Sequence, residues 1–274
     1  MLKLIFISLT IVRRDEMLSL LVKRRGYNVH IYQSNKLEFS LKVLTTLSAS
    51  PLIQQIVPVL EQSHMVRMVN KADSTSDFEF EQAELGHGPE TNKLVSGMDA
   101  IIHSGWLDPE LSASDQLDYQ MRCTYNLLWA AAEEGVSRFI YLSSLKLMEG
   151  YDSDLAVTER WKPTPPSDIS VLGCHLGEMV CREFARERKI NVVVLRLGEI
   201  TQEGNPCPST SALYADDAIQ AIEKSITAET SGWLDIFHIQ SDVPEARFLT
   251  GQQWWSADDV TGPISLGYSP KARG

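Results

Sequence analysis

Two short stretches decide the fold of this chain: residues 97–105 read GMDAIIHSG, and residues 137–144 read SRFIYLSS. In each, a polar start leads into an apolar run, and the run ends in small or hydroxylated residues. The apolar runs lack polar alternation, which is typical of strands that helices bury on both faces. We therefore predict two strands of a parallel sheet.

The same pattern extends outward from these stretches in both directions. Candidate strands lie at residues 3–8, 28–32, 65–69, 99–103, 138–142 and 191–197, with another near 235–240. Amphipathic stretches separate them, most clearly at residues 115–134 and 170–187, with a further helix near 215–228. Short strands that alternate with longer helices predict an α/β fold, a Rossmann-like doubly wound parallel sheet with a small C-terminal lobe.

The pattern also predicts how the chain divides. Residues 1–205 are expected to form the Rossmann-like domain, which begins with a buried strand at residues 3–8. Residues 37–62 are mostly helical in composition but contain Pro51 and Pro58, so we expect a helical insertion there. Residues 206–274 are expected to form a small lobe on the substrate side, interleaved with the first domain.

Composition excludes several classes of partner. The net charge of -11 and the pI near 5.0 disfavour attraction to the phosphates of nucleic acids or to anionic lipid. No apolar run approaches the roughly 20 residues of a membrane span, so no membrane insertion is expected. Four cysteines without paired spacing are read as free thiols of a cytoplasmic protein: Cys123, Cys174, Cys181 and Cys207.

The two opening stretches also resemble a known family. Together with residues 193–198, VVLRLG, they resemble the fourth, fifth and sixth strands of extended short-chain dehydrogenase/reductases of the NAD-dependent epimerase/dehydratase family. Residues 237–242 and 266–270 resemble that family's C-terminal lobe more weakly. The resemblance implies a dinucleotide at the strand ends, near His103, Ser104, Gly105 and Arg196.

The glycine loop of a dinucleotide site is missing where the sequence predicts the first strand. Glycines after that strand let the backbone turn tightly and approach the pyrophosphate. Residues 8–15 contain none, and Arg13 and Arg14 stand beside two acidic residues, which favours a charged helix start over a phosphate site. Residues 31–34 likewise lack the acidic residue that would bind a ribose.

The proton-transfer residues that the resemblance implies are also replaced. The family places a Tyr-x-x-x-Lys pair on the helix after the fifth strand, and residues 170–178 read SVLGCHLGE. Matching Glu178 to the family's frequent glutamate puts Ser170 in the tyrosine position and Cys174 in the lysine position. A serine is a poor acid and a thiol carries no positive charge. Ser143 and Ser144 are displaced candidates for the third catalytic group.

Metal binding and thiol catalysis are not expected. The histidines at 87, 103, 175 and 238 occur singly in different elements, so no metal site is predicted. Cys174 and His175 are adjacent in a helix and point about 100 degrees apart, which disfavours a catalytic dyad.

The sequence therefore favours a catalytically inactive member, a pseudoenzyme with a scaffold, subunit or assembly role and no cofactor. It is expected to bind a protein partner or a second copy through the helices at 115–134 and 170–187, where Leu172, Leu176 and Met179 are apolar. One alternative is an NAD- or NADP-dependent nucleotide-sugar or uronate epimerase/dehydrogenase with an atypical site that uses Tyr151 or Ser144. Another is a binding module that senses a ligand.

Overall fold

The computed structural model describes residues 12–13, 16–17, 40–47, 50–72, 77–105, 111–155, 157–201, 209–248 and 263–271. The chain divides into two compact units, residues 1–38 and residues 39–274. In the first unit the described backbone is an antiparallel pair of two-residue strands, β1 (Val12–Arg13) and β2 (Glu16–Met17). The candidate strands at residues 3–8 and 28–32 lie outside the described residues.

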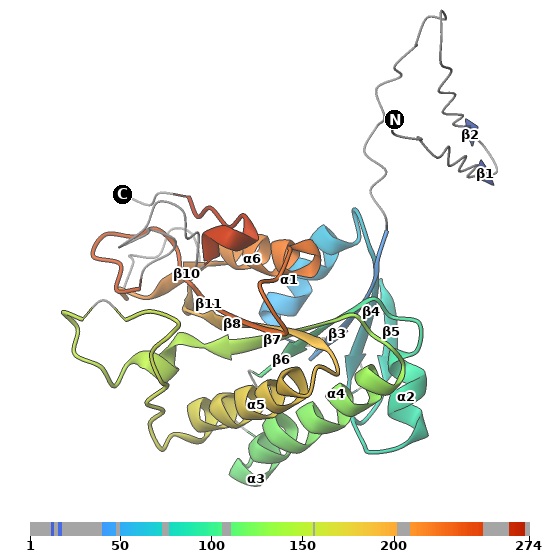
Figure 1. The fold of residues 1–274 in the computed structure, drawn as a ribbon, viewed down its shortest axis with the longest axis horizontal. Helices are drawn as coiled ribbons and strands as arrows, with labels where there is room; N and C mark the ends of the chain where they lie inside the picture. The colour runs from blue at the N-terminus through green and yellow to red at the C-terminus, as the bar shows by residue number, and fades with distance from the viewer. Residues whose placement is uncertain are drawn as a thin grey trace, which may run out of the picture. The chain divides into compact units, whose positions relative to one another are not determined.

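The second unit is built on a seven-stranded sheet in the order β11-β8-β7-β6-β3-β4-β5, in which every pairing is parallel (Figure 1). The strands are β3 (Lys42–Thr46), β4 (Met65–Asn70), β5 (Glu79–Gln82), β6 (Ala100–Ser104), β7 (Arg138–Ser144), β8 (Asn191–Leu197) and β11 (Leu234–Ile239). A small parallel pair, β9 (Glu199–Thr201) and β10 (Ala212–Tyr214), stands beside it.

Helices cover both faces of the sheet, as the lack of polar alternation in the strands requires. One face carries α1 (Pro51–Leu60) and α6 (Ala215–Thr227). The other carries α2 (Pro89–Val95), α3 (Ala113–Leu117), the π-helical η1 (Asp118–Cys123), α4 (Thr124–Glu133) and α5 (Ile169–Arg186) (Figure 1). Short 3-10 turns lie at η2 (Leu145–Met148) and η3 (Pro263–Leu266). The chain is thus an α/β protein with a Rossmann-like doubly wound sheet.

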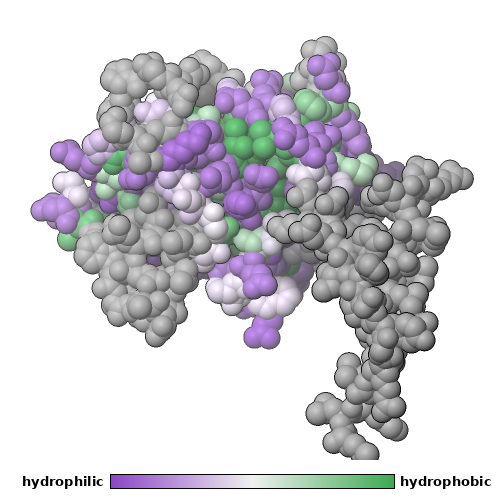
Figure 2. Space-filling model, turned by 90° about the horizontal axis from the view of Figure 1, so that it is seen from above, coloured by the Kyte–Doolittle hydropathy of each residue, from purple (hydrophilic) through white to green (hydrophobic). Residues whose placement is uncertain are grey.

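The core consists of two apolar layers, one on each side of the sheet. Successive strand residues alternate between them: Val43 joins the layer under α1 and α6, whereas Leu44 joins the layer under α2, α4 and α5. The α1 and α6 side is mostly hydrophilic on its outer surface where side chains are placed (Figure 2). Across the described part of the chain, none of the helices is long and apolar enough to span a membrane.

The expectation of a helical insertion at residues 37–62 is wrong. Residues 42–46 form β3, which lies between β4 and β6 near the middle of the sheet, and α1 follows it directly. The two prolines misled the interpretation. Pro51 occupies the first turn of α1, where a missing N–H costs nothing, and Pro58 lies on the exposed face of that helix.

Most other predicted elements are confirmed. The strands at 65–69, 99–103, 138–142 and 191–197 are present within one or two residues, as are the helix near 215–228 and the last strand. Residues 115–134 are helical from α3 through η1 to α4, and α5 packs beside α4 as expected. The segment after residue 206 contributes β11 to the main sheet, and the compact units separate between Glu38 and Phe39.

Candidate functional site

The strand order locates the candidate site. From β3 the sheet continues through β4 and β5 on one side and through β6, β7, β8 and β11 on the other. In doubly wound sheets, ligands bind outside the carboxyl ends of the strands at such a reversal of order. The residues expected there, from His103 to Gly105 and at 143–144, do lie at the ends of β6 and β7.

The turn after β3 occupies the place of a dinucleotide loop, and it contains no glycine. Residues 47–50 read LSAS, so the loop at residues 8–15 was the wrong one to compare, although the conclusion of missing glycines holds for both. Leu47 has a left-handed backbone, with φ of 55°. This conformation costs a residue with a side chain about 1–2 kcal/mol and is normally left to glycine. Leu47 therefore has a backbone conformation typical of glycine.

Helix α1 begins directly after this turn. Its N-cap residue is Ser50, whose side chain makes no capping hydrogen bond, and the first turn carries no acidic residue. Neither the cap residue nor the first turn of α1 therefore supplies a side chain that neutralises the positive end of the helix dipole. Helix N-termini in this state bind phosphate groups.

The second strand of the doubly wound order is β4, and its last residue is Asn70. The residue at the ribose-binding position is therefore expected at the end of β4, and not at residues 31–34 as the sequence suggested. Asn70 Oδ1 accepts a hydrogen bond from the Lys71 backbone N–H at 2.9 Å, and Lys71 Nζ lies 3.0 Å from Glu84 Oε1. Neither Asn70 nor Lys71 was identified from the sequence, although the run VRMVNK marks the end of a strand.

His103 is a structural residue. Its ring is fully buried, with Nδ1 2.8 Å from Thr46 Oγ1 and Nε2 2.9 Å from Thr124 Oγ1. Burial lowers the pKa of His103 to about 3, so the ring is neutral at physiological pH. It thereby ties β3, β6 and α4 together.

Ser170 and Cys174 lie one turn apart at the start of α5, where the resemblance puts the tyrosine and the lysine. Ser170 is exposed, and its Oγ donates to Asp168 Oδ1 at 2.5 Å in the N-cap of the helix. Cys174 is buried and its Sγ donates to the Gly105 carbonyl at 3.5 Å. Burial raises the pKa of Cys174 to about 12, so it carries no charge near neutral pH. These two residues supply neither a phenol nor an ammonium.

Gln120 is a site-adjacent residue that the sequence did not reveal. It lies in the π-helical turn η1, and its Nε2 donates to the carbonyl oxygens of Gly105 at 2.7 Å and Ser170 at 3.0 Å. A Cβ at Gly173 would come within 1.7 Å of Gln120 Oε1. Single π-turns recur at functional sites, and here the turn places an amide between β6 and α5.

Arg196 is part of a buried ion pair. Its Nε and Nη2 donate to the two carboxylate oxygens of Glu178 at 2.9 and 2.7 Å, and the side chains are 1% and 2% exposed. Ser143 Oγ donates to the same carboxylate at 2.6 Å. Arg196 Nη1 lies 3.3 Å from His238 Nε2. The guanidinium therefore fastens α5 to β8 beneath the strand ends and does not face an open cleft.

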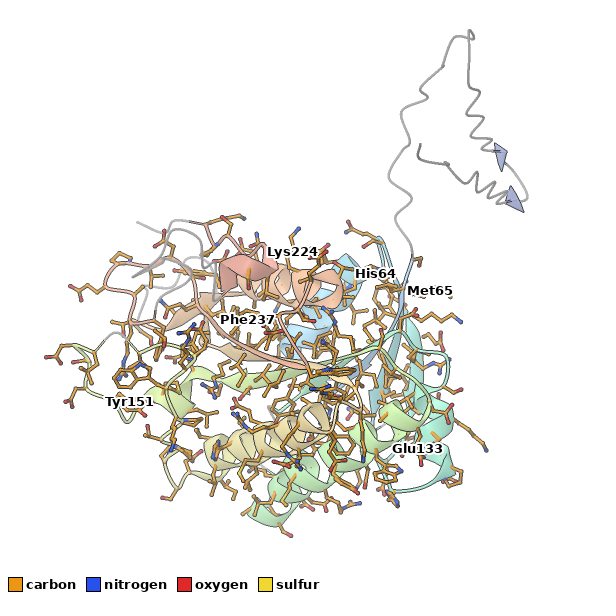
Figure 3. The ribbon with its side chains drawn as sticks, in the orientation of Figure 1. His64, Met65, Glu133, Tyr151, Lys224 and Phe237 are labelled. Atoms are coloured by element: carbon orange, nitrogen blue, oxygen red, sulfur yellow. The ribbon has the colours of Figure 1, made fainter. Side chains whose placement is uncertain are left out.

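The other catalytic candidates are also occupied by local contacts. Ser144 Oγ accepts from the Lys146 N–H at 3.2 Å and caps η2. Tyr151 follows η2 in the loop beyond β7 (Figure 3), where its Oη donates to the Lys162 carbonyl at 2.7 Å. Its ring packs edge-on against Trp161, with ring centroids 4.9 Å apart.

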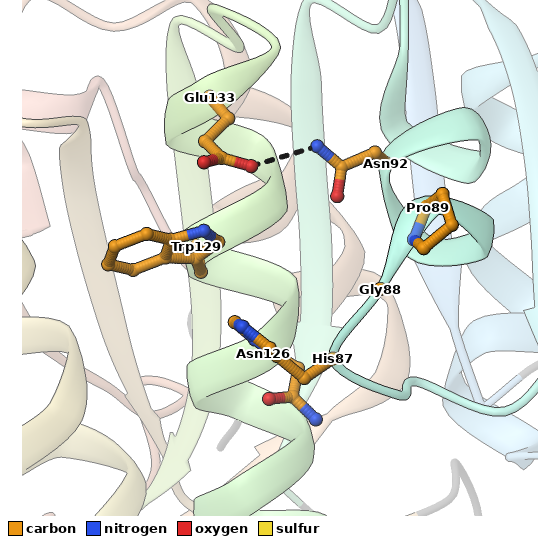
Figure 4. Close-up of a pocket in the computed structure, with 7 residues that line it drawn as sticks. All are labelled: His87, Gly88, Pro89, Asn92, Asn126, Trp129 and Glu133. Carbon is orange, nitrogen blue, oxygen red and sulfur yellow. Dashed lines mark hydrogen bonds between the residues drawn. The ribbon is translucent and has the colours of Figure 1, made fainter.

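A cavity of about 470 Å³ lies between α2 and α4, away from the strand ends (Figure 4). It is lined by His87, Gly88, Pro89, Asn92, Asn126, Trp129 and Glu133. Asn92 Nδ2 donates to Glu133 Oε2 across it at 3.0 Å. Among the residues that the structure describes, no cluster of His, Cys, Asp and Glu is arranged to hold a metal ion.

Comparison with known proteins identifies relatives of this chain. Two curated relatives are the uronate dehydrogenases of Pseudomonas putida, 26% identical over 69% of this chain, and of Agrobacterium fabrum, 26% identical over 58%. The chain spans just under two thirds of their length, 66% and 64%.

Solved structures share the fold. A uronate dehydrogenase from Agrobacterium tumefaciens superposes with a TM-score of 0.71 at 21% identity, covering 85% of each chain. A glucuronic acid dehydrogenase from Chromohalobacter salexigens superposes with a TM-score of 0.69 at 22% identity, covering 84% of each. The sequence model described as the NAD dependent epimerase/dehydratase family matches residues 22–225. The chain therefore belongs to the NAD-dependent epimerase/dehydratase family.

Proposed function

We propose that this protein is an NAD(P)-dependent oxidoreductase of the sugar-acid type, with a uronate as the favoured substrate class and an altered proton-transfer group. The observation that carries the proposal is the turn at Leu47 followed by the uncapped start of α1, at the reversal of strand order in a chain of this family. The curated relatives are uronate dehydrogenases, and they give no support for a catalytically inactive interpretation.

In this proposal the phosphates of the dinucleotide lie at the start of α1. The backbone of the turn at Leu47 and the first turn of α1 would hold the pyrophosphate, and Asn70 and Lys71 lie where the adenosine ribose is bound in such folds. A related short-chain dehydrogenase/reductase superfamily protein from Agrobacterium tumefaciens has been solved with bound NAD. When bound, the dinucleotide accepts a hydride from the carbon that is oxidised.

The protein's own residues must take up the proton that the substrate hydroxyl releases. Ser170 is in position to relay that proton to Asp168, to which its hydroxyl is hydrogen-bonded, or to solvent, to which it is exposed. A serine hydroxyl is a weak general base, and the neutral Cys174 provides no positive charge nearby. Turnover limited by proton transfer follows from this arrangement.

A second candidate function is ligand binding without turnover, the role closest to the inactive member that the sequence favours. The specific observation behind it is the replacement of both proton-transfer residues by Ser170 and a buried thiol. In that case the protein would sense a dinucleotide or a sugar acid.

We also propose that α4 and α5 form the contact with a second copy. Three large apolar residues on the outer faces of η1, α4 and α5 are exposed: Met121 by 50%, Tyr125 by 41% and Met179 by 51%. Exposed apolar side chains gathered on adjacent helices are typical of an association surface.

A cytoplasmic location remains a prediction from the cysteine usage.

One experiment separates the two functions. The purified full-length protein is titrated with NAD, NADH, NADP and NADPH by calorimetry, and reduction of the oxidised forms is then followed with glucuronate and galacturonate. Binding with uronate-dependent reduction supports the oxidoreductase. Binding of a dinucleotide without reduction supports the second candidate. No binding of any dinucleotide up to millimolar concentration contradicts the oxidoreductase and also the sensing of a dinucleotide.

A matched variant tests the assignment of the proton-transfer residues. Ser170→Tyr combined with Cys174→Lys restores a phenol and an ammonium one turn apart, so it should raise the rate of reduction while changing dinucleotide affinity little. Ser170→Ala is the control. A wild-type rate that is unaffected by Ser170→Ala would show that another group takes the proton.

A further inference from the structure

We propose that the dinucleotide preferred by this protein carries a 2′-phosphate, so that NADP binds in preference to NAD, and that Asn70 and Lys71 select it. This inference rests on the proposed function, because it concerns the ribose end of the same site. Several relatives have been solved with NAD, among them a uronate dehydrogenase from Agrobacterium tumefaciens, so the inference rests on the residues of this chain and not on those relatives.

The position of Asn70 is what makes it a selecting residue. β4 pairs in parallel with β3, and its carboxyl end therefore lies beside the turn at Leu47. In dinucleotide folds an acidic residue near this point hydrogen-bonds the 2′-hydroxyl of NAD, whereas a cation there accommodates the 2′-phosphate of NADP. This chain has a neutral amide followed by a lysine.

The hydrogen bond that Asn70 already makes leaves its amide nitrogen as the group that can bind a ligand, and this nitrogen is a hydrogen-bond donor. Its Oδ1 already accepts the Lys71 backbone N–H at 2.9 Å. The remaining Nδ2 group is an NH₂, which donates hydrogen bonds and does not accept them. Phosphate oxygens are acceptors, so the amide is matched to a phosphate and carries no charge that would repel it.

Lys71 supplies the positive charge. Its backbone carbonyl accepts from Gln82 Nε2 at 3.0 Å, which ties the residue to the end of β5. Its Nζ lies 3.0 Å from Glu84 Oε1, and the two side chains are 78% and 72% exposed. An exposed pair of this kind contributes little to stability, so an arriving phosphate with nearly two negative charges can displace the carboxylate.

Glu84 is the carboxylate partner of Lys71 that a 2′-phosphate would have to displace. Its carboxylate raises the pKa values of Lys71 and also of Arg122, whose main partner is Asp118. A negative group at this point therefore interacts with Lys71, which directly follows β4, and with Arg122 of η1. Since the carboxylate of Glu84 competes with a phosphate, removing its charge should favour the phosphate.

Calorimetry on the full-length protein tests the preference, with NADP and NAD as whole ligands and 2′-AMP and 5′-AMP as fragments. We expect NADP to bind at least about tenfold more tightly than NAD, as a charge-assisted hydrogen bond to a phosphate allows. The advantage should shrink as salt is added, because both partners are exposed to solvent.

Variants assign the preference to residues. Lys71→Ala should remove the NADP advantage and leave NAD affinity unchanged, whereas Lys71→Arg should retain it. Asn70→Asp should shift the preference toward NAD. Glu84→Gln should increase the affinity for NADP and leave the affinity for NAD unchanged. Lys93→Ala, at an exposed lysine of α2, is the matched control and should change neither affinity.

The outcomes are distinguishable from failure of the proposed function. If NAD binds as tightly as NADP or more tightly, the 2′-phosphate inference is overturned while the oxidoreductase proposal stands. An NADP preference that survives Lys71→Ala overturns the assignment to Lys71. If neither dinucleotide binds, both proposals fail.

Discussion

Arg196 and Glu178 are the most deeply buried charged pair in the described part of the chain, and they lie directly under the candidate site. Two parallel hydrogen bonds join the guanidinium to the carboxylate, so that each charge is compensated by the other. Ser143 adds a third hydrogen bond to the carboxylate. Removing one partner of such a pair leaves an uncompensated charge, which is more costly than removing both.

We predict that Glu178→Gln lowers the free energy of unfolding by about 3–5 kcal/mol, the usual cost of breaking a buried pair. The double variant Glu178→Gln with Arg196→Met should lose less than the single one. Urea denaturation measures both. Glu183→Gln is the control, because its pair with Arg186 is exposed and should contribute less than about 1 kcal/mol. A double variant less stable than the single would contradict this account of Arg196.

The buried His103 predicts a pH dependence of stability. Its pKa is about 3 in the folded protein, below the ordinary value of 6.5. Between these two pH values only the unfolded chain takes up a proton at His103. The contribution of the neutral His103 to the free energy of unfolding is therefore complete above pH 6.5 and is lost as the pH falls toward 3, at about 1.4 kcal/mol per pH unit.

Urea denaturation between about pH 7 and about pH 4 checks this prediction. The slope of the wild-type curve includes other groups, among them His238, whose pKa burial and the nearby Arg196 also lower. The wild type is therefore compared with His103→Gln. In this variant the free energy of unfolding should depend less steeply on pH, by the slope that one proton contributes. Parallel curves for the two proteins would show that His103 is protonated in the folded state.

Among the candidate residues, Ser170 and Cys174 lie one turn apart on α5, as the sequence predicts, because their spacing is a property of one helix. Arg196 was named as a residue of the cleft, but its environment is set by Glu178 on α5, eighteen positions away, and by His238 on β11. Gln120 was not found at all, because only the π-helical turn directs its amide to Gly105.

At the scale of elements, α5 is the helix that organises the site. Two glycines let it approach its neighbours closely: a Cβ at Gly173 would collide with Gln120, and a Cβ at Gly177 would lie 2.0 Å from Tyr141 Oη. The opposite face of α5 is turned outward and carries the exposed Met179. The helix therefore has one face fitted to the core and another available to a partner.

We predict that Met179→Glu converts a dimer into a monomer. The change introduces a negative charge into the proposed contact between copies, and the side chain is exposed in the single chain, so its folding should be unaffected. Light scattering measures the mass, and circular dichroism checks the fold. Lys224→Gln, at an exposed position of α6 on the other side of the sheet, should leave the mass unchanged. A wild-type protein that is monomeric at micromolar concentration would remove the basis for this contact.

Helix periodicity was a reliable guide to elements, whereas the short strand β3 was not recognised. Residues 42–46 read KVLTT, which contains only two strongly apolar residues followed by two threonines. Both threonines are nonetheless buried, and Thr46 is bonded to His103. A buried polar residue that is satisfied by a distant partner cannot be told from a surface residue by local pattern.

At the scale of the whole molecule, two successive segments of the sequence carry similar patterns of residues. Residues 3–32 and residues 42–70 each begin with a lysine and an apolar run, and each ends in an apolar run followed by an amide, Gln33 or Asn70. The structure uses the second segment for β3, α1 and β4 of the main sheet.

We therefore predict that residues 39–274 fold without the first unit. The seven strands and both apolar layers come from residues beyond 41, so removing residues 1–38 takes nothing from the described core. The truncated protein should melt cooperatively within a few degrees of the full chain by circular dichroism. A truncated protein that is unfolded or aggregates would show that residues 1–38 belong to the core.

The sequence alone determined the α/β class, the family resemblance, most helix and strand positions, and that Ser170 and Cys174 stand one turn apart on α5. These properties depend on periodicity and spacing within single elements, which a chain carries locally. The tertiary structure alone decided that β3 stands at the reversal of strand order, that Leu47 and Asn70 lie at the carboxyl ends of two paired strands, and that Arg196 is buried. These depend on pairing between residues far apart in the chain, where several registers satisfy the same local pattern and only the packed sheet selects one.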